Sequence, residues 1–222
     1  MPENTEINEV NEEQTNSSVK DNTPKKKKGS IINDLFEIIE STLITIFVMV
    51  LIFTYLLHPV NVVGSSMNNT LVDGDDVFMC TICPSIDYGD VVIIDNNEAF
   101  LLSDDGQVIK KDISNSRLNE CIIKRVIALP GQTLEIKPDT HEVIVDGKVL
   151  DETYIKEPLN SGGVFSYPIT IPEGYYFVMG DNRNNSADSR DGDVGLISKD
   201  QIYGVAVARY APIKEFKILL YK

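Results

Sequence analysis

The residues of this chain best suited to covalent chemistry are a serine and a lysine. Ser66 lies in a Gly-Ser-Ser-Met stretch, and Lys124 opens a Lys-Arg-Val-Ile stretch further along the chain. A serine hydroxyl becomes an effective nucleophile when a neighbouring base removes its proton, and a neutral lysine amine can be that base. The two residues therefore suggest a Ser-Lys dyad that attacks a carbonyl group.

The expected surroundings of Lys124 would favour its neutral form. From Cys121 to Ala128 a period of two places Ile122, Lys124, Val126 and Ala128 on one face of a strand. Burial among apolar side chains disfavours the ammonium ion, so we expect the pKa of Lys124 to fall. The competing interpretation is a lysine with a buried stem and an ammonium group that reaches water, which is the commoner case for a single strand lysine.

The neighbours of Ser66 also suit a nucleophile. Gly64 lets the backbone pass close to a bound peptide, and Met67 places an apolar side chain beside the hydroxyl. A lone Gly-Ser-Ser sequence is more often only a turn. Neither His58 nor His141 lies in a comparable setting, so the sequence does not favour a Ser-His triad.

A third segment, over residues 179–190, reads Met-Gly-Asp-Asn-Arg-Asn-Asn-Ser-Ala-Asp-Ser-Arg. Its composition alone indicates a solvated polar loop. The loop follows a predicted strand of the same domain. It indicates a function only when it is taken together with the serine and lysine segments.

The element that precedes these segments is an apolar stretch. Residues 43–57 are apolar except for two Thr and one Tyr, and as a helix they would span about 22 Å, less than a hydrocarbon core of roughly 30 Å. We therefore extend the helix back and predict a transmembrane signal anchor over residues 31–58. Four lysines at positions 25–28 favour a cytoplasmic N-terminus and an extracytoplasmic remainder. No pair of small residues follows the span, so we expect it to be retained.

The rest of the chain predicts one mainly β domain. Residues 1–30, with few apolar side chains, are expected to form a disordered cytoplasmic tail. Residues 59–222 are enough to bury one core, and no long amphipathic helix occurs in them. The expected strands, in an antiparallel sheet, lie at residues 90–94, 121–128, 133–137, 175–179 and 216–222, with a hairpin over 143–150 on an Asp-Gly turn. Residues 96–119 suggest a surface insertion or a small lid.

Charge and cysteine content exclude several functions. A net charge of -14 argues against nucleic-acid binding. Cys80, Cys83 and Cys121 are too few for a disulfide framework, and a four-ligand zinc site at Cys80 and Cys83 would lack two ligands. We expect no metal and no cofactor. Reduced thiols at Cys80 and Cys83 are the favoured state, with a disulfide as the alternative.

Together these segments resemble the bacterial type I signal peptidases, membrane-bound Ser-Lys endopeptidases that remove signal peptides from exported preproteins. The resemblance runs from the anchor to about residue 210. It rests on four blocks in order: Gly-Ser-Ser-Met with Thr70 and Leu71, Tyr-Gly-Asp-Val-Val at 88–92, Lys-Arg-Val-Ile-Ala at 124–128 with Pro130 and Gly131, and the Gly-Asp-Asn-Arg to Ser-Ala-Asp-Ser-Arg loop.

The resemblance implies roles for five residues. Ser66 would be the nucleophile and Lys124 the general base. Ser186 would hydrogen-bond the lysine, and Asp188 and Arg190 would form an ion pair that braces the site. The expected mechanism is acyl transfer through an ester on the serine.

It also implies partners and a location. Signal peptides with small residues before the cut, in an Ala-X-Ala pattern, would bind to subsites lined by Met67, Ile122, Val126 and similar residues. The lipid bilayer would hold the anchor, and transient proximity to the secretion translocon is expected. The cell membrane, crossed once, is the expected location.

The sequence departs from the family pattern at several positions. Asn69 stands where many relatives have proline, Gln132 replaces a common aspartate, and the segment over 96–119 is longer than in many relatives. Gly64 lacks the hydroxyl that some relatives carry there, so the oxyanion hole would rely on backbone N–H groups, chiefly that of Ser66.

Two other functions are weighed against this one. A Ser-Lys self-cleaving repressor would need an N-terminal DNA-binding helical domain and a cytosolic setting, and the anchor opposes both. A non-catalytic, membrane-anchored surface scaffold would account for the domain equally well. The presence of both Ser66 and Lys124 opposes that alternative.

Overall fold

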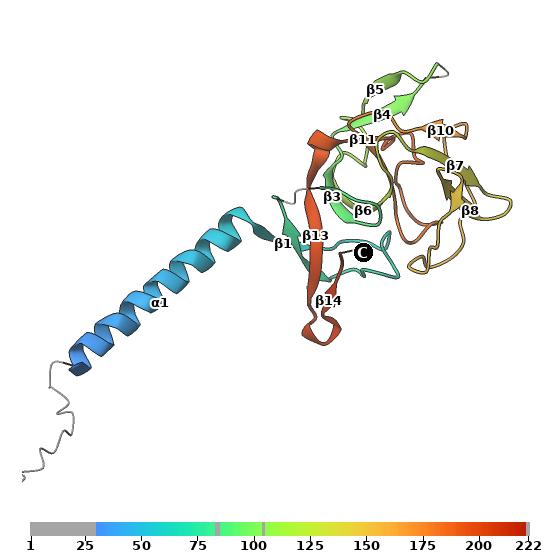
Figure 1. Cartoon of the computed structure of the whole chain (residues 1–222). Helices are drawn as coiled ribbons and strands as arrows, with labels where there is room; N and C mark the ends of the chain where they lie inside the picture. The colour runs from blue at the N-terminus through green and yellow to red at the C-terminus, as the bar shows by residue number, and fades with distance from the viewer. Residues whose placement is uncertain (1–29, 83–84, 104, 221–222) are drawn as a thin grey trace, which may run out of the picture. The chain divides into compact units, whose positions relative to one another are not determined.

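A computed structural model describes residues 30–82, 85–103 and 105–220 of the chain (Figure 1). The tail predicted over residues 1–30 lies outside these ranges except for Ser30, which begins a helix, and Cys83 lies outside them as well.

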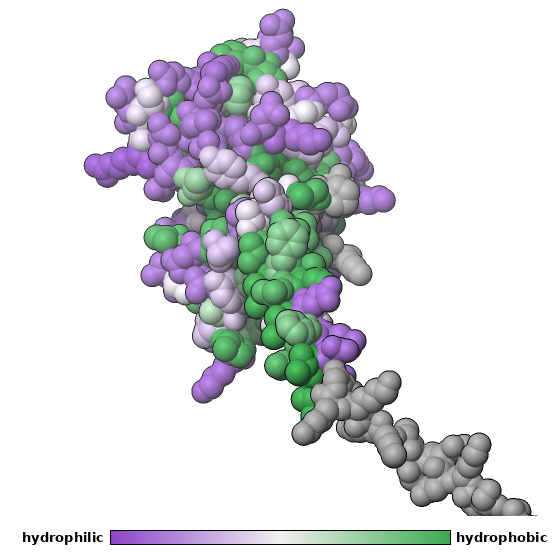
Figure 2. Space-filling model, turned by 90° about the vertical axis from the view of Figure 1, so that its left-hand side faces the viewer, coloured by the Kyte–Doolittle hydropathy of each residue, from purple (hydrophilic) through white to green (hydrophobic). Residues whose placement is uncertain are grey.

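Helix α1, Ser30–Tyr55, is built from the apolar stretch. Its residues Ile31–Tyr55 are long and apolar enough to be a candidate membrane span. Figure 2 shows apolar side chains along most of its visible surface. The helix ends before the predicted boundary at His58, because strand β1, Leu57–Asn61, already begins there. Pro59 opposes a helix that continues through His58, since proline disfavours the helical conformation of the residue before it.

The remainder is mainly β, as the sequence predicts. Its largest sheet has eight strands, in the order β1-β2-β13-β3-β6-β11-β12 with β14 paired to β13, and each pairing is antiparallel. Besides β1, the strands are β2 Asp76–Cys80, β3 Val91–Asp95, β6 Cys121–Ala128, β11 Tyr175–Met179, β12 Ile197–Ser198, β13 Ile202–Ala211 and β14 Lys217–Ile218. Short 3-10 helices, η1 Lys199–Gln201 and η2 Ile213–Glu215, flank β13.

A second sheet has four strands, in the order β10-β7-β8-β9. They are β7 Thr133–Lys137, β8 Glu142–Val145, β9 Lys148–Val149 and β10 Ile169–Thr170. The predicted hairpin is confirmed: Asp146 and Gly147 have φ of 49° and 76° between β8 and β9, the backbone that a two-residue Asp-Gly turn favours.

The segment over residues 96–119 contains a hairpin of its own. Strands β4 Glu98–Leu102 and β5 Val108–Asp112 pair only with each other in a two-stranded sheet among the described residues. The hairpin projects from the body of the domain between the ends of β3 and β6 (Figure 1). One isolated bridge ties it to the domain, because the N–H of Leu196 donates to the carbonyl of Phe100 over 2.7 Å.

Strand β6 follows the predicted period of two over most of its length. Ile122 and Val126 pack in one core cluster, and Lys124 lies opposite Val92 of the same cluster. The prediction is wrong for Ala128, which packs in a different cluster. The register of β6 against β11 shifts between Val126 and Ala128, and such a bulge turns the following side chain to another face.

Candidate active site

The serine and lysine singled out by the sequence meet in the structure. Lys124 Nζ lies 2.9 Å from Ser66 Oγ and 2.8 Å from the carbonyl oxygen of Ile123. Lys124 is carried by β6, whereas Ser66 lies in a turn between β1 and β2. A rigid central strand thus presents the amine, and a tight turn presents the hydroxyl.

Lys124 is desolvated rather than extended to water. The residue is 4% exposed, so the interpretation of a lysine with a solvated ammonium group is wrong. Burial lowers the pKa of Lys124 from 10.5 to about 8, against the opposing effect of the carboxylates of Asp188, Glu120 and Asp181. At pH 7 about one tenth of the amine is therefore neutral, and the neutral fraction rises with pH.

This pKa predicts how activity depends on pH. The base must be neutral to accept a proton, so we expect kcat/KM for peptide cleavage to rise with pH through about 8 as Lys124 loses its proton. Rates measured from about pH 6 to about pH 10 test this. A flat profile, or a rate that falls across this interval, would contradict the role of Lys124 as base.

The carbonyls of the serine turn are tied to the polar loop at residues 180–190. Asn182 donates its backbone N–H to the carbonyl of Ser66 over 2.9 Å and its Nδ2 to the carbonyl of Ser65 over 3.0 Å. Asn185 Nδ2 donates to Ser65 Oγ over 2.9 Å. Among the described residues, nothing accepts from the backbone N–H of Ser66. The turn is fixed through its carbonyls, and this N–H remains available to a substrate.

Gly64 has a conformational reason to be glycine. Its φ is +90°, and a Cβ at this position would meet no atom within 4 Å. Its N–H already donates to Asp73 Oδ1 over 2.7 Å, so this group is not a free donor. The left-handed backbone, rather than crowding, favours glycine here.

The polar loop supports the site differently from what the resemblance implies. Asp188 and Arg190 form the expected ion pair, with Arg190 Nε and a terminal nitrogen each 2.8 Å from a carboxylate oxygen. Asp188 also accepts from the N–H of Gly180 over 2.9 Å. The expected bond from Ser186 to Lys124 is not formed, since Ser186 Oγ is buried without a partner among the described residues. The lysine nitrogen is directed instead at Ser66 and at the Ile123 carbonyl.

A cavity of about 260 Å³ opens beside the dyad. Of the residues predicted to bind substrate, Met67 and Ile122 line it, but Val126 does not, because it is fully buried in the core. Mostly apolar residues that the sequence did not indicate complete the lining: Val60, Asn61, Val62, Val63, Ile93, Leu118, Glu120, Cys121, Ile123 and Ala187. The alternation of Val60 and Val62 beside the serine turn is the one local signal that could have indicated part of this wall.

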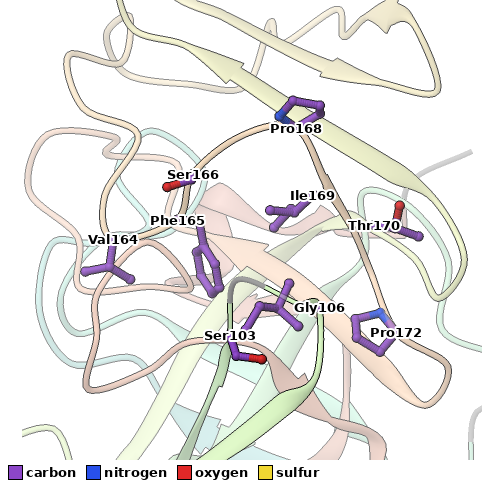
Figure 3. A pocket seen from close by; sticks show the side chains of 10 residues that line it. Ser103, Gly106, Val164, Phe165, Ser166, Pro168, Ile169, Thr170 and Pro172 are labelled. Atoms are coloured by element: carbon purple, nitrogen blue, oxygen red, sulfur yellow. The ribbon is translucent and has the colours of Figure 1, made fainter.

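A larger cavity, about 510 Å³, lies between the β4–β5 hairpin and residues 164–172 (Figure 3). Hydroxyl side chains and apolar groups line it, among them Ser103, Phe165 and Pro168, and none of its lining residues is charged. It lacks a nucleophile with a base, so the smaller cavity is the candidate active site.

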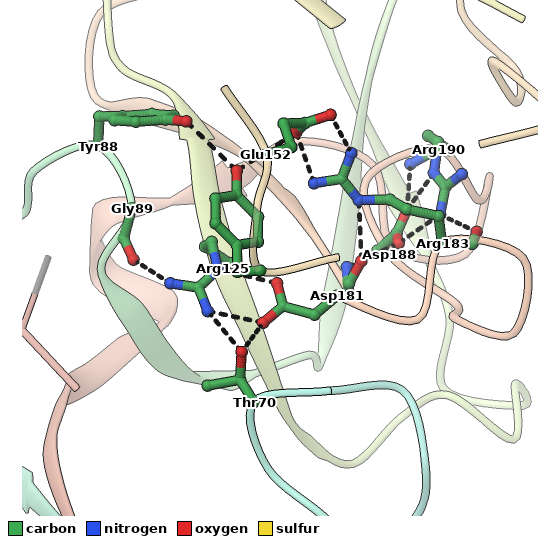
Figure 4. Close-up of polar contacts among 11 residues, drawn as sticks. Thr70, Tyr88, Gly89, Arg125, Glu152, Asp181, Arg183, Asp188 and Arg190 are labelled. Atoms are coloured by element: carbon green, nitrogen blue, oxygen red, sulfur yellow. Dashed lines mark hydrogen bonds and ion pairs between the residues drawn. The ribbon is translucent and has the colours of Figure 1, made fainter. Parts of the chain in front are cut away.

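A buried ion pair behind the dyad was not predicted (Figure 4). Arg125 Nε lies 2.8 Å from Asp181 Oδ1, and a terminal nitrogen lies 2.6 Å from Oδ2. The same guanidinium donates to Gly89 O over 2.6 Å and to Thr70 Oγ1 over 3.0 Å. Because Arg125 follows the lysine on a buried strand, its side chain lies on the opposite face of that strand. A buried guanidinium there needs a charged partner. The pair joins β6, the serine turn and the polar loop.

The two cysteines in the described residues form no disulfide there: Cys80 is half-buried in β2, and Cys121 is exposed at the start of β6. Because Cys83 lies outside the described residues, the expected redox state of the Cys80 and Cys83 pair stays a prediction.

Comparison with known proteins gives one consistent result. The family model described as "Signal peptidase, peptidase S26" matches residues 35–211. Signal peptidase I of Bacillus licheniformis is 34% identical over 196 residues, covering 83% of this chain and 93% of that protein. Signal peptidase I T of Bacillus subtilis (strain 168) is 35% identical over 207 residues, covering 88% and 95%. A crystal structure of a signal peptidase I from Enterococcus faecalis V583 has 25% identity and a TM-score of 0.38, covering 55% and 96%.

The extent of the family match and the identity to these relatives agree with the residues that the fold brings together, and the chain belongs to the signal peptidase family, peptidase S26.

Proposed function

We propose that this protein is a membrane-anchored serine endopeptidase that removes N-terminal signal peptides from exported preproteins. The observation that carries the proposal is the contact between Ser66 Oγ and the buried Lys124 Nζ, 2.9 Å apart, in a chain of the signal peptidase family. The buried amine, with its lowered pKa, supports the role of general base.

The first half of the reaction forms an ester. Neutral Lys124 takes the proton of Ser66 as Oγ attacks the scissile carbonyl carbon, and the backbone N–H of Ser66 donates to the developing oxyanion. The carbon–nitrogen bond then breaks, and protonated Lys124 gives its proton to the leaving amine of the mature protein. The signal peptide stays attached to Ser66 through its new carboxyl ester.

The second half releases the signal peptide. Neutral Lys124 takes a proton from a water molecule, the hydroxide attacks the ester carbonyl, and Ser66 regains a proton as the ester bond breaks. The mostly apolar cavity of about 260 Å³ supports binding of small side chains before the cut, in keeping with an Ala-X-Ala pattern. Of the residues predicted to contact substrate, Met67 and Ile122 line this cavity.

The proposed location follows from α1 and the lysines at positions 25–28. The N-terminus would be cytoplasmic, the helix would cross the membrane once, and the β domain would be extracytoplasmic. Anchoring enzyme and substrate in one bilayer raises their effective concentration, and it would bring the enzyme near the translocon. The scaffold alternative does not explain a desolvated lysine in contact with a serine, and α1 is the only α-helix among the described residues, which disfavours a repressor.

One experiment tests both activity and location. Intact protoplasts that carry the chain receive a membrane-impermeant peptide with an Ala-X-Ala site, and mass spectrometry maps the product. We expect cleavage after the second Ala outside the cells. Protoplasts that carry Ser66→Ala should cleave no more peptide than protoplasts that lack the chain. Cleavage that appears only after lysis would contradict the location, and absence of cleavage in both preparations would contradict the activity.

A further inference from the structure

A segment without strands, residues 150–168, connects β9 to β10 and lies against the polar loop. We call it the crossing segment. Its backbone N–H groups at Lys156 and Val164 donate to the carbonyls of Asp181 and Arg190, over 2.9 and 3.0 Å. Further along, Asn184 Nδ2 donates to the carbonyl of Pro158 over 2.9 Å. The crossing segment is therefore attached to the polar loop along much of that loop's length.

Glu152 of this segment pairs with a buried arginine of the loop (Figure 4). The two terminal nitrogens of Arg183 lie 2.9 and 2.7 Å from the two carboxylate oxygens of Glu152, and the two side chains are 0% and 7% exposed. Arg183 Nε donates to the carbonyl of Gly180 over 3.1 Å. The carboxylate thus orients a guanidinium that in turn holds the backbone of Gly180.

Tyr154 lies between the two arginines behind the dyad. Its ring centroid is 4.2 Å from the guanidinium carbon of Arg125 and 5.9 Å from that of Arg183, within the range of cation–π attraction. Its hydroxyl lies 3.3 Å from both Glu152 and Tyr88. The ring stabilises two desolvated cations that would otherwise repel each other.

The arginines act on the reacting groups through strand β6 and the polar loop. Arg125 follows Lys124 on β6 and pairs with Asp181. Gly180 packs so closely against the serine turn that a Cβ there would lie 2.6 Å from the carbonyl oxygen of Ser66. A displaced guanidinium would therefore move the polar loop against Ser66, or β6 against the loop.

We propose that Glu152 and Tyr154 are positioning residues of the peptidase reaction, which fix Arg183 and Arg125 and thereby keep Ser66 Oγ within reach of Lys124 Nζ. This inference rests on the proposed function. Neither residue touches the cavity beside the dyad, so they affect the alignment of the dyad and not the binding of substrate.

The test uses the full chain in detergent with the Ala-X-Ala peptide, at a temperature where each variant is folded by circular dichroism. We expect Glu152→Gln to lower kcat by about 100-fold, the effect of a misplacement of about 1 Å, with KM changed less than about threefold. The pH midpoint of its activity should also move, because the surroundings of Lys124 change. Glu157→Gln is the matched control, since Glu157 is exposed on the same segment, and it should match the wild type.

Two Tyr154 variants keep the test valid if Glu152→Gln does not fold. Tyr154→Phe retains the ring over the arginines, whereas Tyr154→Leu removes it, so we expect the second to lose about tenfold more kcat. Folded variants with wild-type kcat and pH midpoint, or equal losses for Phe and Leu, would overturn the inference. Absence of cleavage by the wild type would instead count against the proposed function.

Discussion

Lys124→Ala is expected to lower peptide cleavage by about 10⁴-fold or more, because it removes the base that activates the serine. Ser66→Ala should have an effect of the same size, since no other hydroxyl replaces the nucleophile. The double variant should be no slower than either single variant, because the two groups act as one unit. These expectations follow from the 2.9 Å contact between the two side chains.

The measurement is kcat/KM on a synthetic Ala-X-Ala peptide, with mass spectrometry to identify the cut. Lys148→Ala is the matched control, because Lys148 also lies on a strand but is exposed, and it should leave cleavage unchanged. Strong residual cleavage by Lys124→Ala would show that another group is the base. Independent, additive losses in the double variant would show that the two residues do not form a dyad.

Strands with local signals could be predicted from the sequence. The alternating run at β7 and the aromatic run at β11 coincide with the predicted strands, and the hairpin at Asp146 and Gly147 follows from turn chemistry alone. The last strand is confirmed only in part, since β14 covers Lys217–Ile218. In each case the information lies within a few consecutive residues.

Strand β13 shows where local reasoning fails. It lies at the centre of the large sheet, between β2 and β3, but was not predicted. Its Gly204 weakens the strand signal. The glycine is required by tertiary structure, because a Cβ at that position would collide with the carbonyl of Cys80 on β2. Such a requirement depends on a residue far away in the sequence, which no local pattern indicates.

The same distinction holds for the site. The reacting groups could be identified because serine, lysine and their neighbours have distinctive chemistry. The side chains that hold them could not be, since Asp181, Glu152 and Tyr154 are ordinary polar or aromatic residues until the fold places them against buried arginines. Val126 was misassigned for a similar reason, because strand periodicity gives a face but not the boundary between core and cavity.

Gly180→Ala is the second change with a large expected effect. A Cβ at this position would lie 2.6 Å from both the Ser66 carbonyl oxygen and the Cβ of Ser186, and closer still to Ser186 Oγ. The serine turn cannot yield freely, because Asn182 holds the same carbonyl by a 2.9 Å hydrogen bond. We expect overpacking to lower the free energy of unfolding by about 1–3 kcal/mol. We also expect displacement of the nucleophile to lower kcat by about 100-fold.

The control for Gly180→Ala lies at the other end of the same strand. Gly174 precedes β11 and has φ +82°, yet a Cβ there would meet no atom within 4 Å. Gly174→Ala should therefore cost about 1 kcal/mol in backbone strain and leave kcat unchanged. Adding Ser186→Gly to Gly180→Ala removes one of the two collisions, so stability should recover in part while kcat stays low, because the Ser66 carbonyl is still displaced. Recovery of full activity in that double variant would show that Ser186, and not the serine turn, limits the space around Gly180.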